Sequence, residues 1–368
     1  MARESMSPRG RHVIRPRRRR RLVVGAITAV VLPALLVAAV VLRMLNNVST
    51  VEVETIQASE PDGPLNVLLI GSDARSAGGG RYGDDDGTGR SDSMVLAHLS
   101  AQNDRIDAVQ IPRDLMMEVP ACEDAGWPGG MLMINATFDF GPSCAHRAVE
   151  AVTGVPIHHL VVLDFDGFEQ MVDALGGIDV CLDEPVRDQW SMADLPAGPQ
   201  KLNGEQALAL ARTRHAFGDG SDIARMENQQ RVMSAIAQQA TSEGLLTRPD
   251  RLVRFLNAVT SSLTVDDALG SPGELVSLAS RVASVPLSAI TFQVMPWQPA
   301  SFDPNRVEMT DEARELFAAL RDDVSPDAAA ESPDEESPAA PDDPQQDAAA
   351  PEPVAPPAER RSADVPLC

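Results

Sequence analysis

Residues 158–182 of this chain read HHLVVLDFDGFEQMVDALGGIDVCL, and this stretch decides the class of fold. Its first part is a short run of branched aliphatic residues, which predicts a buried strand. Good helix formers follow in residues 167–175, and Gly176 and Gly177 end that helix because glycine adopts the left-handed backbone of a helix terminus. Residues 178–182 return to the pattern of a strand. A strand, a helix and a strand in this order are typical of an α/β domain.

The same alternation extends in both directions from this unit. The predicted strands are residues 65–71, 93–100, 105–112 and 289–296, and the predicted helices are residues 202–211, 222–241, 247–257, 273–282 and 310–320. The chain has 368 residues and is 43% hydrophobic, which is ample for a core. We therefore predict one α/β/α sandwich with a mixed central sheet over residues 64–323.

The N-terminal segment has the composition of a membrane anchor. Residues 1–21 carry nine arginines and one glutamate, a net charge of +8, and residues 22–42 carry no charge. A helix of that length spans the roughly 30 Å hydrocarbon core of a bilayer. The positive-inside rule then keeps residues 1–21 in the cytoplasm and leaves the rest of the chain outside the cell membrane. The outside part begins with a stalk at residues 43–63. The alternative is a cleaved signal peptide, but its apolar region would be shorter, about 7–15 residues.

Four cysteines agree with an extracytoplasmic location, where disulfides form. Of the three possible sets of pairs we favour Cys122 with Cys144, which closes a loop of about twenty residues, and Cys181 with Cys368 is the remaining pair. Beyond residue 323 the chain is acidic, rich in proline and alanine, and free of aromatic residues. We predict that residues 324–368 form a disordered tail, because they bury too little apolar surface to offset the entropy of ordering.

A candidate phosphate site begins with ARTRH at residues 211–215. Arg212 and Arg214 would project to the same side of an extended segment. A helical stripe then runs from polar to apolar side chains and comprises Asp222, Arg225, Gln229, Met233, Ile236 and Ala240. Guanidinium groups bind phosphate oxygens two at a time and keep their charge. This cluster therefore predicts a phosphate or pyrophosphate site.

Four short motifs fall at or just after strand ends: GSDAR at 71–75, GRSDS at 89–93 and IPRD at 111–114, which each hold an arginine and an aspartate, and LMIN at 132–135, which holds Asn135. Such loops form the ligand crevice of open α/β sheets. Each motif alone is also explained by a capped turn or a surface ion pair. Together with ARTRH they fit a polyphosphate with a divalent cation. Asp73 and Asp92 are the candidate ligands of Mg²⁺ or Mn²⁺, because Mg²⁺ is held by one or two carboxylates and by substrate phosphates.

Taken in order, these motifs resemble the LytR-CpsA-Psr family of bacterial cell-envelope proteins. The resemblance covers about residues 64–323 and rests on LNVLLIGSDAR, GRSDSMVLAHL, VQIPRDLMMEVP, INATFDFGP, LVVLDFDGFEQMVDALGGIDVCL, LNGEQALALARTRH and DIARMENQQ. The cysteine pair and the acidic tail are similar to those of actinobacterial members. The resemblance implies a membrane-anchored protein whose extracytoplasmic domain transfers a glycopolymer from a polyprenyl-pyrophosphate carrier onto peptidoglycan.

The resemblance also implies roles for individual residues. Asp73 and Asp92 match the metal-associated aspartates of the family. The positions that match its pyrophosphate-binding and catalytic residues are Arg90, Arg113, Arg212, Arg214, Asp222 and Arg225. Those that match substrate-binding positions are Arg75, Asn135 and Gln229. The family often has lysine two residues before the asparagine, where this chain has Met133.

The expected activity is that of a Mg²⁺-dependent phosphotransferase in cell-wall assembly, with pyrophosphate hydrolysis as a side activity. Its partners would be the lipid-linked glycopolymer, peptidoglycan and the membrane. The alternative is a non-catalytic polyprenyl-pyrophosphate binder, or an envelope sensor that attenuates transcription. Nucleic-acid binding is disfavoured, because the basic block lies beside the predicted membrane helix and the whole chain has a net charge of −23.

Overall fold

The structure is a computed structural model of the chain. It describes residues 28, 31, 47–53, 60, 63–72, 91–214, 222–242, 245, 247–326 and 360–364. Contacts divide the chain into residues 1–46 and residues 47–368, and the fold described below is that of the second unit. No helix within the described ranges is both long and apolar enough to cross a membrane. The predicted membrane helix at residues 22–42 lies outside those ranges, except for positions 28 and 31.

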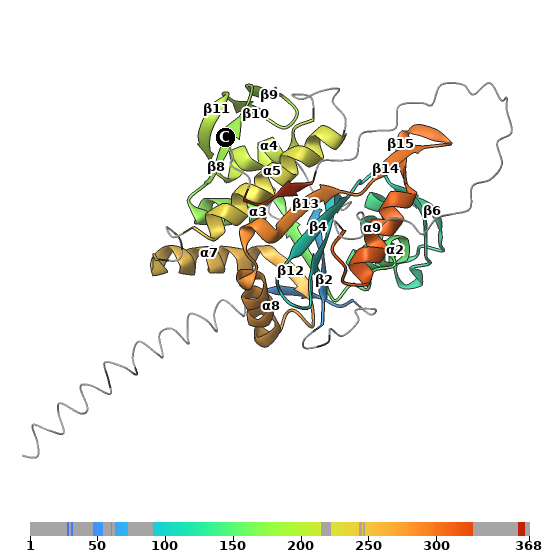
Figure 1. Ribbon diagram of the computed structural model, residues 1–368, viewed down its shortest axis with the longest axis horizontal. Helices are drawn as coiled ribbons and strands as arrows, with labels where there is room; N and C mark the ends of the chain where they lie inside the picture. Colours follow the sequence, from blue (N-terminus) through green and yellow to red (C-terminus); the bar gives the residue numbers. More distant parts are fainter. Residues whose placement is uncertain are drawn as a thin grey trace, which may run out of the picture. The chain divides into compact units, whose positions relative to one another are not determined.

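A mixed sheet of eight strands forms the centre of the domain (Figure 1). In order across the sheet, the strands are β1 (Ser49–Val51), β12 (Leu263–Asp266), β7 (His159–Asp164), β2 (Leu65–Ser72), β3 (Ser91–Leu99), β4 (Ile106–Ile111), β13 (Ile290–Val294) and β16 (Arg361–Ser362). The pairs β1–β12, β2–β7 and β4–β13 are parallel, and the other neighbours are antiparallel. The prediction of a mixed sheet is confirmed.

The remaining elements surround this sheet. The α-helices named below are α2 (Pro142–Thr153), α3 (Phe165–Leu175), α4 (Gly204–Arg212), α5 (Asp222–Ala240), α7 (Pro249–Ser262), α8 (Pro272–Ser284) and α9 (Asp311–Arg321). Short 3₁₀ helices are η1 (Glu123–Ala125), η2 (Ile134–Phe140) and η3 (Leu287–Ala289). Two-stranded sheets pair β5 (Met116–Val119) with β6 (Gly130–Met133), β8 (Ile178–Leu182) with β11 (Gly198–Leu202), β9 (Val186–Asp188) with β10 (Ala193–Leu195), and β14 (Trp297–Ala300) with β15 (Asp303–Met309).

One edge of the central sheet collects residues that the sequence singles out. β2 and β7 run parallel, and their last residues, Ser72 and Asp164, lie opposite each other. β3 and β4 are antiparallel and pair Met94 with Ile111, so β3 begins where β4 ends. The sequence predicts Asp92 in a strand-end loop directly before the strand at residues 93–100, but it is the second residue of β3. It still reaches this edge, because β3 runs in the opposite direction.

Helices cover both faces of the sheet, as predicted. α2 and α9 lie on one face (Figure 1). Leu68 is fully buried on this face, and Phe317 of α9 joins the same core. Leu69, the next residue of β2, points to the other face, which α3, α5 and α8 cover. Leu69 is 36% exposed although strands flank β2 on both sides. An exposed leucine in the middle of a sheet indicates that side chains do not fill the space on that face.

The segment that carries the arginine pair is set by a helix with defined ends. α4 begins after Asn203, whose side chain forms a reciprocal capping box with Gln206. It ends at Arg212, because the backbone of Thr213 is extended. α4 packs with α3, α5 and β8 in a second apolar cluster. Residues 178–182 form the predicted strand, but this strand, β8, pairs with β11 outside the central sheet.

The end of the chain differs from the sequence prediction. The sequence predicts disorder throughout residues 324–368, and this is wrong for residues 360–364. The backbone N–H of Ala363 donates to the carbonyl of Ile290 at 2.8 Å, and the carbonyl of Ala363 accepts from Gln238 at 2.7 Å. Ala363 is fully buried beside Phe292. The segment stays there because an edge strand such as β13 has backbone groups that need hydrogen-bond partners.

The structure contains the Cys122–Cys144 disulfide, with the two Cα atoms 5.7 Å apart. The bond ties the start of η1 to α2, a helix that the sequence analysis does not predict. Cys181 is disulfide-bonded as well. Cys368, the remaining cysteine of the sequence, lies outside the described residues.

Candidate functional site

A cavity of about 860 Å³ lies between the second face of the sheet and the helices α3, α5 and α8. Protein cores are normally packed without voids of this size, whereas ligand pockets measure about 300–1,000 Å³. The exposure of Leu69 follows from this cavity, which it lines. Most of the wall is apolar and includes Val67, Leu69, Val95, Phe165, Phe168, Met171, Met233, Ile236 and Phe292.

The cavity has a polar end and an apolar end. Asp92, at the start of β3, and Leu99, at its end, both line the cavity. Seven residues of extended chain cover about 23 Å, so the cavity follows the length of the strand. Ile106, which pairs with Leu99, also lines the apolar end. The charged and amide lining comes instead from the edge where β3 begins and comprises Asp92, Asp164, Asp188, Arg212, Arg214, Arg225 and Gln229.

Asp92 holds two guanidinium groups together at the polar end. Its Oδ1 accepts a hydrogen bond from Nη1 of Arg113 at 2.9 Å and lies 3.4 Å from Nη1 of Arg225. Arg225 is only 3% exposed, so its charge requires compensation inside the protein. Asn135 is buried beside them, and its backbone N–H donates to the carbonyl of Arg113 at 3.3 Å. Four residues far apart in sequence therefore meet at one place.

Arg212 and Arg214 line the same cavity, as the sequence predicts, although Arg212 is the last residue of a helix rather than part of an extended segment. The guanidinium carbon of Arg212 lies 4.7 Å from the ring centroid of Phe165, a cation–π contact. The backbone N–H of Arg214 donates to Oδ2 of Asp188 at 3.2 Å. Both arginines are thus positioned by groups on neighbouring elements.

α5 supplies a stripe that changes from polar to apolar, as predicted. Gln229 accepts a hydrogen bond from Nε2 of Gln110 on β4 and donates to the carbonyl of Ala211 at 3.3 Å. These bonds fix the middle of the helix between the sheet and the end of α4. The stripe residues that line the cavity are Arg225, Gln229, Met233 and Ile236. Asp222 is the first residue of α5, and its side chain lies outside the described part of the structure.

Three predicted site residues, Asp73, Arg75 and Arg90, lie outside the described residues, so their roles stay predictions. Within the described ranges, no three side chains of the metal-binding types form a cluster. The assignment of Mg²⁺ or Mn²⁺ to Asp73 and Asp92 also stays a prediction.

The sequence analysis misses several residues of this site. Asp188 lines the cavity and is 4% exposed, but it ends β9, a strand of three residues that is too short to show a periodicity. Phe165 is 47 positions from the arginine that it contacts, and no local pattern connects them. Asp164 also lines the cavity, and burial raises the pKa of its carboxyl group. Gln110 offers the one usable signal, because it is a polar residue in a strand whose residues are all buried.

The sequence model of the LytR_cpsA_psr family matches residues 41–320, which include every site residue described above. The chain belongs to this family. The resemblance found in the sequence motifs is confirmed.

Three curated relatives illustrate the family. The probable cell wall biosynthesis protein LcpB of Corynebacterium glutamicum is 33% identical over 70% of this chain and 61% of its own length. LcpA of the same organism, a cell wall biosynthesis protein, is 29% identical over 64% of this chain and 50% of its own. TagU of Bacillus cereus, a polyisoprenyl-teichoic acid–peptidoglycan teichoic acid transferase, is 33% identical over 58% of this chain and 64% of its own. The chain thus spans one half to two thirds of these relatives.

Solved structures show the same fold. A LytR-Csp2A-Psr enzyme from Actinomyces oris superposes with a TM-score of 0.60 at 25% identity, over 76% of this chain and 97% of that protein. TagT, solved bound to LI-WTA, superposes with a TM-score of 0.56 at 21% identity, over 74% of this chain and 99% of TagT.

Proposed function

We propose that this LytR_cpsA_psr family protein is a phosphotransferase that moves a glycopolymer from a polyprenyl-pyrophosphate carrier onto peptidoglycan. One observation carries the proposal: a single cavity has arginines at one end and an apolar wall along the rest of its length. A lipid pyrophosphate has the same division, a charged group followed by a long hydrocarbon chain. The names of TagU, LcpA and LcpB, a teichoic acid transferase and two cell wall biosynthesis proteins, support the same assignment.

The polar end suits a pyrophosphate for electrostatic reasons. Planar guanidinium groups pair with phosphate oxygens bidentately and stay charged at any physiological pH. Arg212 ends α4, Arg214 follows two residues later, and Arg225 lies on α5, and all three line the same space. Each of them lines a cavity of low polarity, where charge interactions are stronger than in water. The apolar wall would gain about 0.8 kcal/mol for each CH₂ group that the lipid buries there.

The proposed reaction forms and breaks one phosphorus–oxygen bond. A hydroxyl oxygen of peptidoglycan attacks the phosphorus that bears the glycan, the bond from that phosphorus to the prenyl monophosphate breaks, and the hydroxyl proton is released. The arginines stabilise the charge that develops on the transferred phosphoryl group and on the leaving phosphate. Asp92 and Asp222 are the candidates to orient or deprotonate the attacking hydroxyl.

The divalent cation is part of the proposal. Asp92 fits a ligand role, because its carboxylate lines the cavity and its side chain is 25% exposed. Asp73 is the second candidate ligand. When bound, Mg²⁺ or Mn²⁺ would neutralise phosphate charge that the arginines do not cover.

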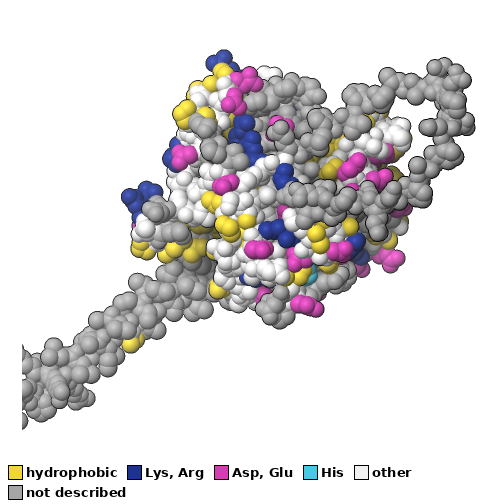
Figure 2. Space-filling view, in the orientation of Figure 1, with side chains coloured by type: hydrophobic (Ala, Val, Ile, Leu, Met, Phe, Trp, Pro, Cys, Tyr) yellow, Lys and Arg dark blue, Asp and Glu magenta, His cyan; other side chains and the backbone are white. Residues whose placement is uncertain are grey.

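We also propose that residues 22–42 anchor the protein in the cell membrane and that the domain after them is extracytoplasmic. The uncharged stretch, the arginines before it and the disulfide support this topology. A nucleic-acid ligand finds no support on the face drawn in Figure 2, where acidic and basic side chains of the described residues are interspersed.

Transfer by the purified full-length protein in detergent tests the proposed function. The assay supplies glycopolymer-bearing polyprenyl pyrophosphate, peptidoglycan strands and Mg²⁺, and it measures the polyprenyl monophosphate and the strand-bound glycan that form. We expect the two products in equal amounts. We expect Arg212→Ala to lower the rate by about 100-fold or more. Arg254→Ala is the matched control, because Arg254 is exposed on α7 and pairs only with Asp250 among the described contacts.

Two outcomes contradict the proposal. If the wild-type protein binds the lipid tightly but forms neither product, it is a lipid-pyrophosphate binder or sensor. If Arg212→Ala and Arg254→Ala lower the rate equally, the arginine pair has no special part in the reaction.

A further inference from the structure

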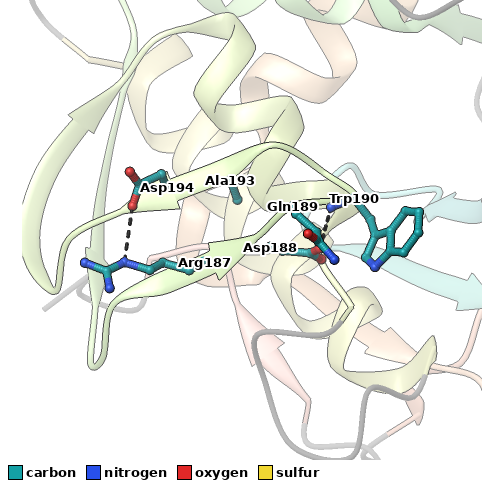
Figure 3. A pocket seen from close by; sticks show the side chains of 6 residues that line it. All are labelled: Arg187, Asp188, Gln189, Trp190, Ala193 and Asp194. Atoms are coloured by element: carbon teal, nitrogen blue, oxygen red, sulfur yellow. Dashed lines mark hydrogen bonds and ion pairs between the residues drawn. The ribbon is translucent and has the colours of Figure 1, made fainter.

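A second, shallower hollow of about 480 Å³ opens beside the main cavity (Figure 3). It lies on the β9–β10 hairpin, and its lining consists of Arg187, Asp188, Gln189, Trp190, Ala193 and Asp194. Asp188 and Trp190 line the main cavity as well. The two spaces therefore adjoin at these two residues, and Trp190 borders both of them.

Trp190 is 72% exposed. A single exposed apolar side chain is ordinary on a protein surface, so its exposure decides nothing alone. What distinguishes Trp190 is how its backbone is held. Oδ1 of Asp188 accepts from the backbone N–H of Trp190 at 2.9 Å, and Oδ2 of the same carboxylate accepts from the backbone N–H of Arg214 at 3.2 Å. One buried side chain thus fixes the tryptophan relative to the arginine pair.

A second link joins the same two segments. The hydroxyls of Ser191 and Thr213 are hydrogen-bonded at 2.6 Å, and both residues are buried. Met192, the next residue of the turn, has φ of +61°, a value that is uncommon for residues with a side chain. The turn keeps this backbone because its buried hydrogen bonds hold it. The exposed indole is therefore presented by a rigid hairpin and does not sit on a loose loop.

The chemistry of the hollow matches a sugar ring. A pyranose has a face of C–H groups, which packs on an aromatic plane, and an edge of hydroxyls, which need both donors and acceptors. The indole supplies the plane. Next to it Gln189 offers an amide, and farther along the hairpin Arg187 and Asp194, an exposed ion pair at 3.4 Å, offer a donor and an acceptor (Figure 3).

We propose that this hollow binds a saccharide unit, with Trp190 as the stacking platform, immediately beside the pyrophosphate end of the main cavity. The proposal rests on the proposed function, since it names the part of the substrate that lies outside that cavity. Two sources present the same chemistry: the first sugars of the lipid-linked glycan, and the glycan strand of the peptidoglycan acceptor. The experiment below separates them.

Binding to the full-length protein in detergent is measured with three probes: glycan-bearing polyprenyl pyrophosphate, the same lipid without sugar, and soluble uncrosslinked peptidoglycan strands. We expect Trp190→Ala to weaken binding of a sugar-containing probe by about tenfold and to affect the sugar-free lipid much less, although Trp190 also borders the main cavity. Trp190→Phe keeps an aromatic plane and should lose less. Phe302→Ala is the matched control, because Phe302 is an aromatic residue that is 61% exposed between β14 and β15 and lines neither space.

A loss for the glycan-bearing lipid alone assigns the hollow to the donor, and a loss for the strands alone assigns it to the acceptor. The proposal is overturned if Trp190→Ala, with the thermal stability of the wild type, binds both sugar-containing probes normally. It is overturned equally if the sugar-free lipid loses the same affinity, since the indole would then serve the lipid. A wild-type protein without transfer activity but with Trp190-dependent sugar binding would refute only the proposed function.

Discussion

Arg225 and Ile236 lie on one face of α5 and line the same cavity, Arg225 beside Asp92 and Ile236 beside apolar side chains. Eleven residues separate them, which is about 16 Å along the helix axis. A single helix therefore carries both kinds of surface that a lipid pyrophosphate needs. The predictions below test the two ends of this helix separately.

Replacing Arg225 by methionine tests the charged end. The change keeps an unbranched side chain but removes the guanidinium group, a buried charge that pairs with Asp92. We expect affinity for polyprenyl pyrophosphate to fall about 10- to 100-fold, because a hydrogen bond to a charged group contributes about 1.5–3 kcal/mol. Arg231→Met is the control on the same helix, since Arg231 does not line the cavity. Equal losses in a binding titration of the two variants would count against the account.

Replacing Met233 by tryptophan tests the apolar end. The larger side chain would occupy space in the middle of the cavity that Met233 lines. We expect affinity for a long prenyl pyrophosphate to fall about tenfold or more, because each buried CH₂ that is lost costs about 0.8 kcal/mol, and affinity for a chain of two isoprene units to change little. Met131→Trp, at an exposed position on β6, is the matched control. A variant that binds long and short chains equally less well would argue against a tail site here.

Removing the disulfide should destabilise the fold. Cys122 and Cys144 are separated by 22 positions, and in the chain-entropy model a loop of this size contributes about 3 kcal/mol to the free energy of unfolding. We expect the Cys122→Ala, Cys144→Ala double variant to lose about that amount in urea unfolding. The wild type in reductant should lose at least as much, because reduction also breaks the disulfide of Cys181. A loss below about 1 kcal/mol would show that the bond does not constrain the unfolded chain.

Stability should decrease in acid because of His158. Its Nδ1 accepts a hydrogen bond from the backbone N–H of Asn66 at 2.9 Å, and burial, with nearby positive charges, lowers the pKa of His158 to about 4. Between the unfolded value of 6.5 and pH 4, the unfolded chain binds a proton here that the folded chain does not. As the pH is lowered through this window, the free energy of unfolding therefore decreases, by about 3 kcal/mol from this group. Above the window this group causes no change.

His158→Asn provides the comparison for that pH dependence. Asparagine can place an acceptor near the position of Nδ1 but does not titrate. Urea unfolding at pH 7 and pH 4 should show a smaller loss for the variant than for the wild type. Equal losses would mean that other groups, such as His98 with its lowered pKa, cause the effect.

The strands that carry the site are predictable from sequence, and the cavity is not. LNVLLIG reads as a continuously buried strand, and β2 does occupy residues 65–72. Within it, Leu68 packs in the core while Leu69 faces an open space. A leucine looks the same in either place, because whether a space is filled depends on the helix opposite. The polar-to-apolar stripe on α5 is the part of the cavity that a sequence pattern can reveal.

Contacts across long separations explain the other differences. The residue that holds Arg214, Asp188, lies in a hairpin whose short strands have too few residues to show an alternation. Residues 361–362 become a strand because β13 offers an open edge, which no local propensity encodes. Helix α2 is missed although Pro142 opens it, and its buried alanines give only a weak apolar pattern.

Photo-cross-linking of the lipid tail tests the central claim most directly. A polyprenyl pyrophosphate with a diazirine near the end of its prenyl chain is irradiated with the full-length protein, and modified peptides are identified by mass spectrometry. We expect adducts at residues that line the apolar part of the cavity, such as Met233 and Ile236. These adducts should disappear when unlabelled lipid competes, and they should be absent in Arg225→Met. Adducts confined to other surfaces, or unaffected by the competitor, would contradict the claim.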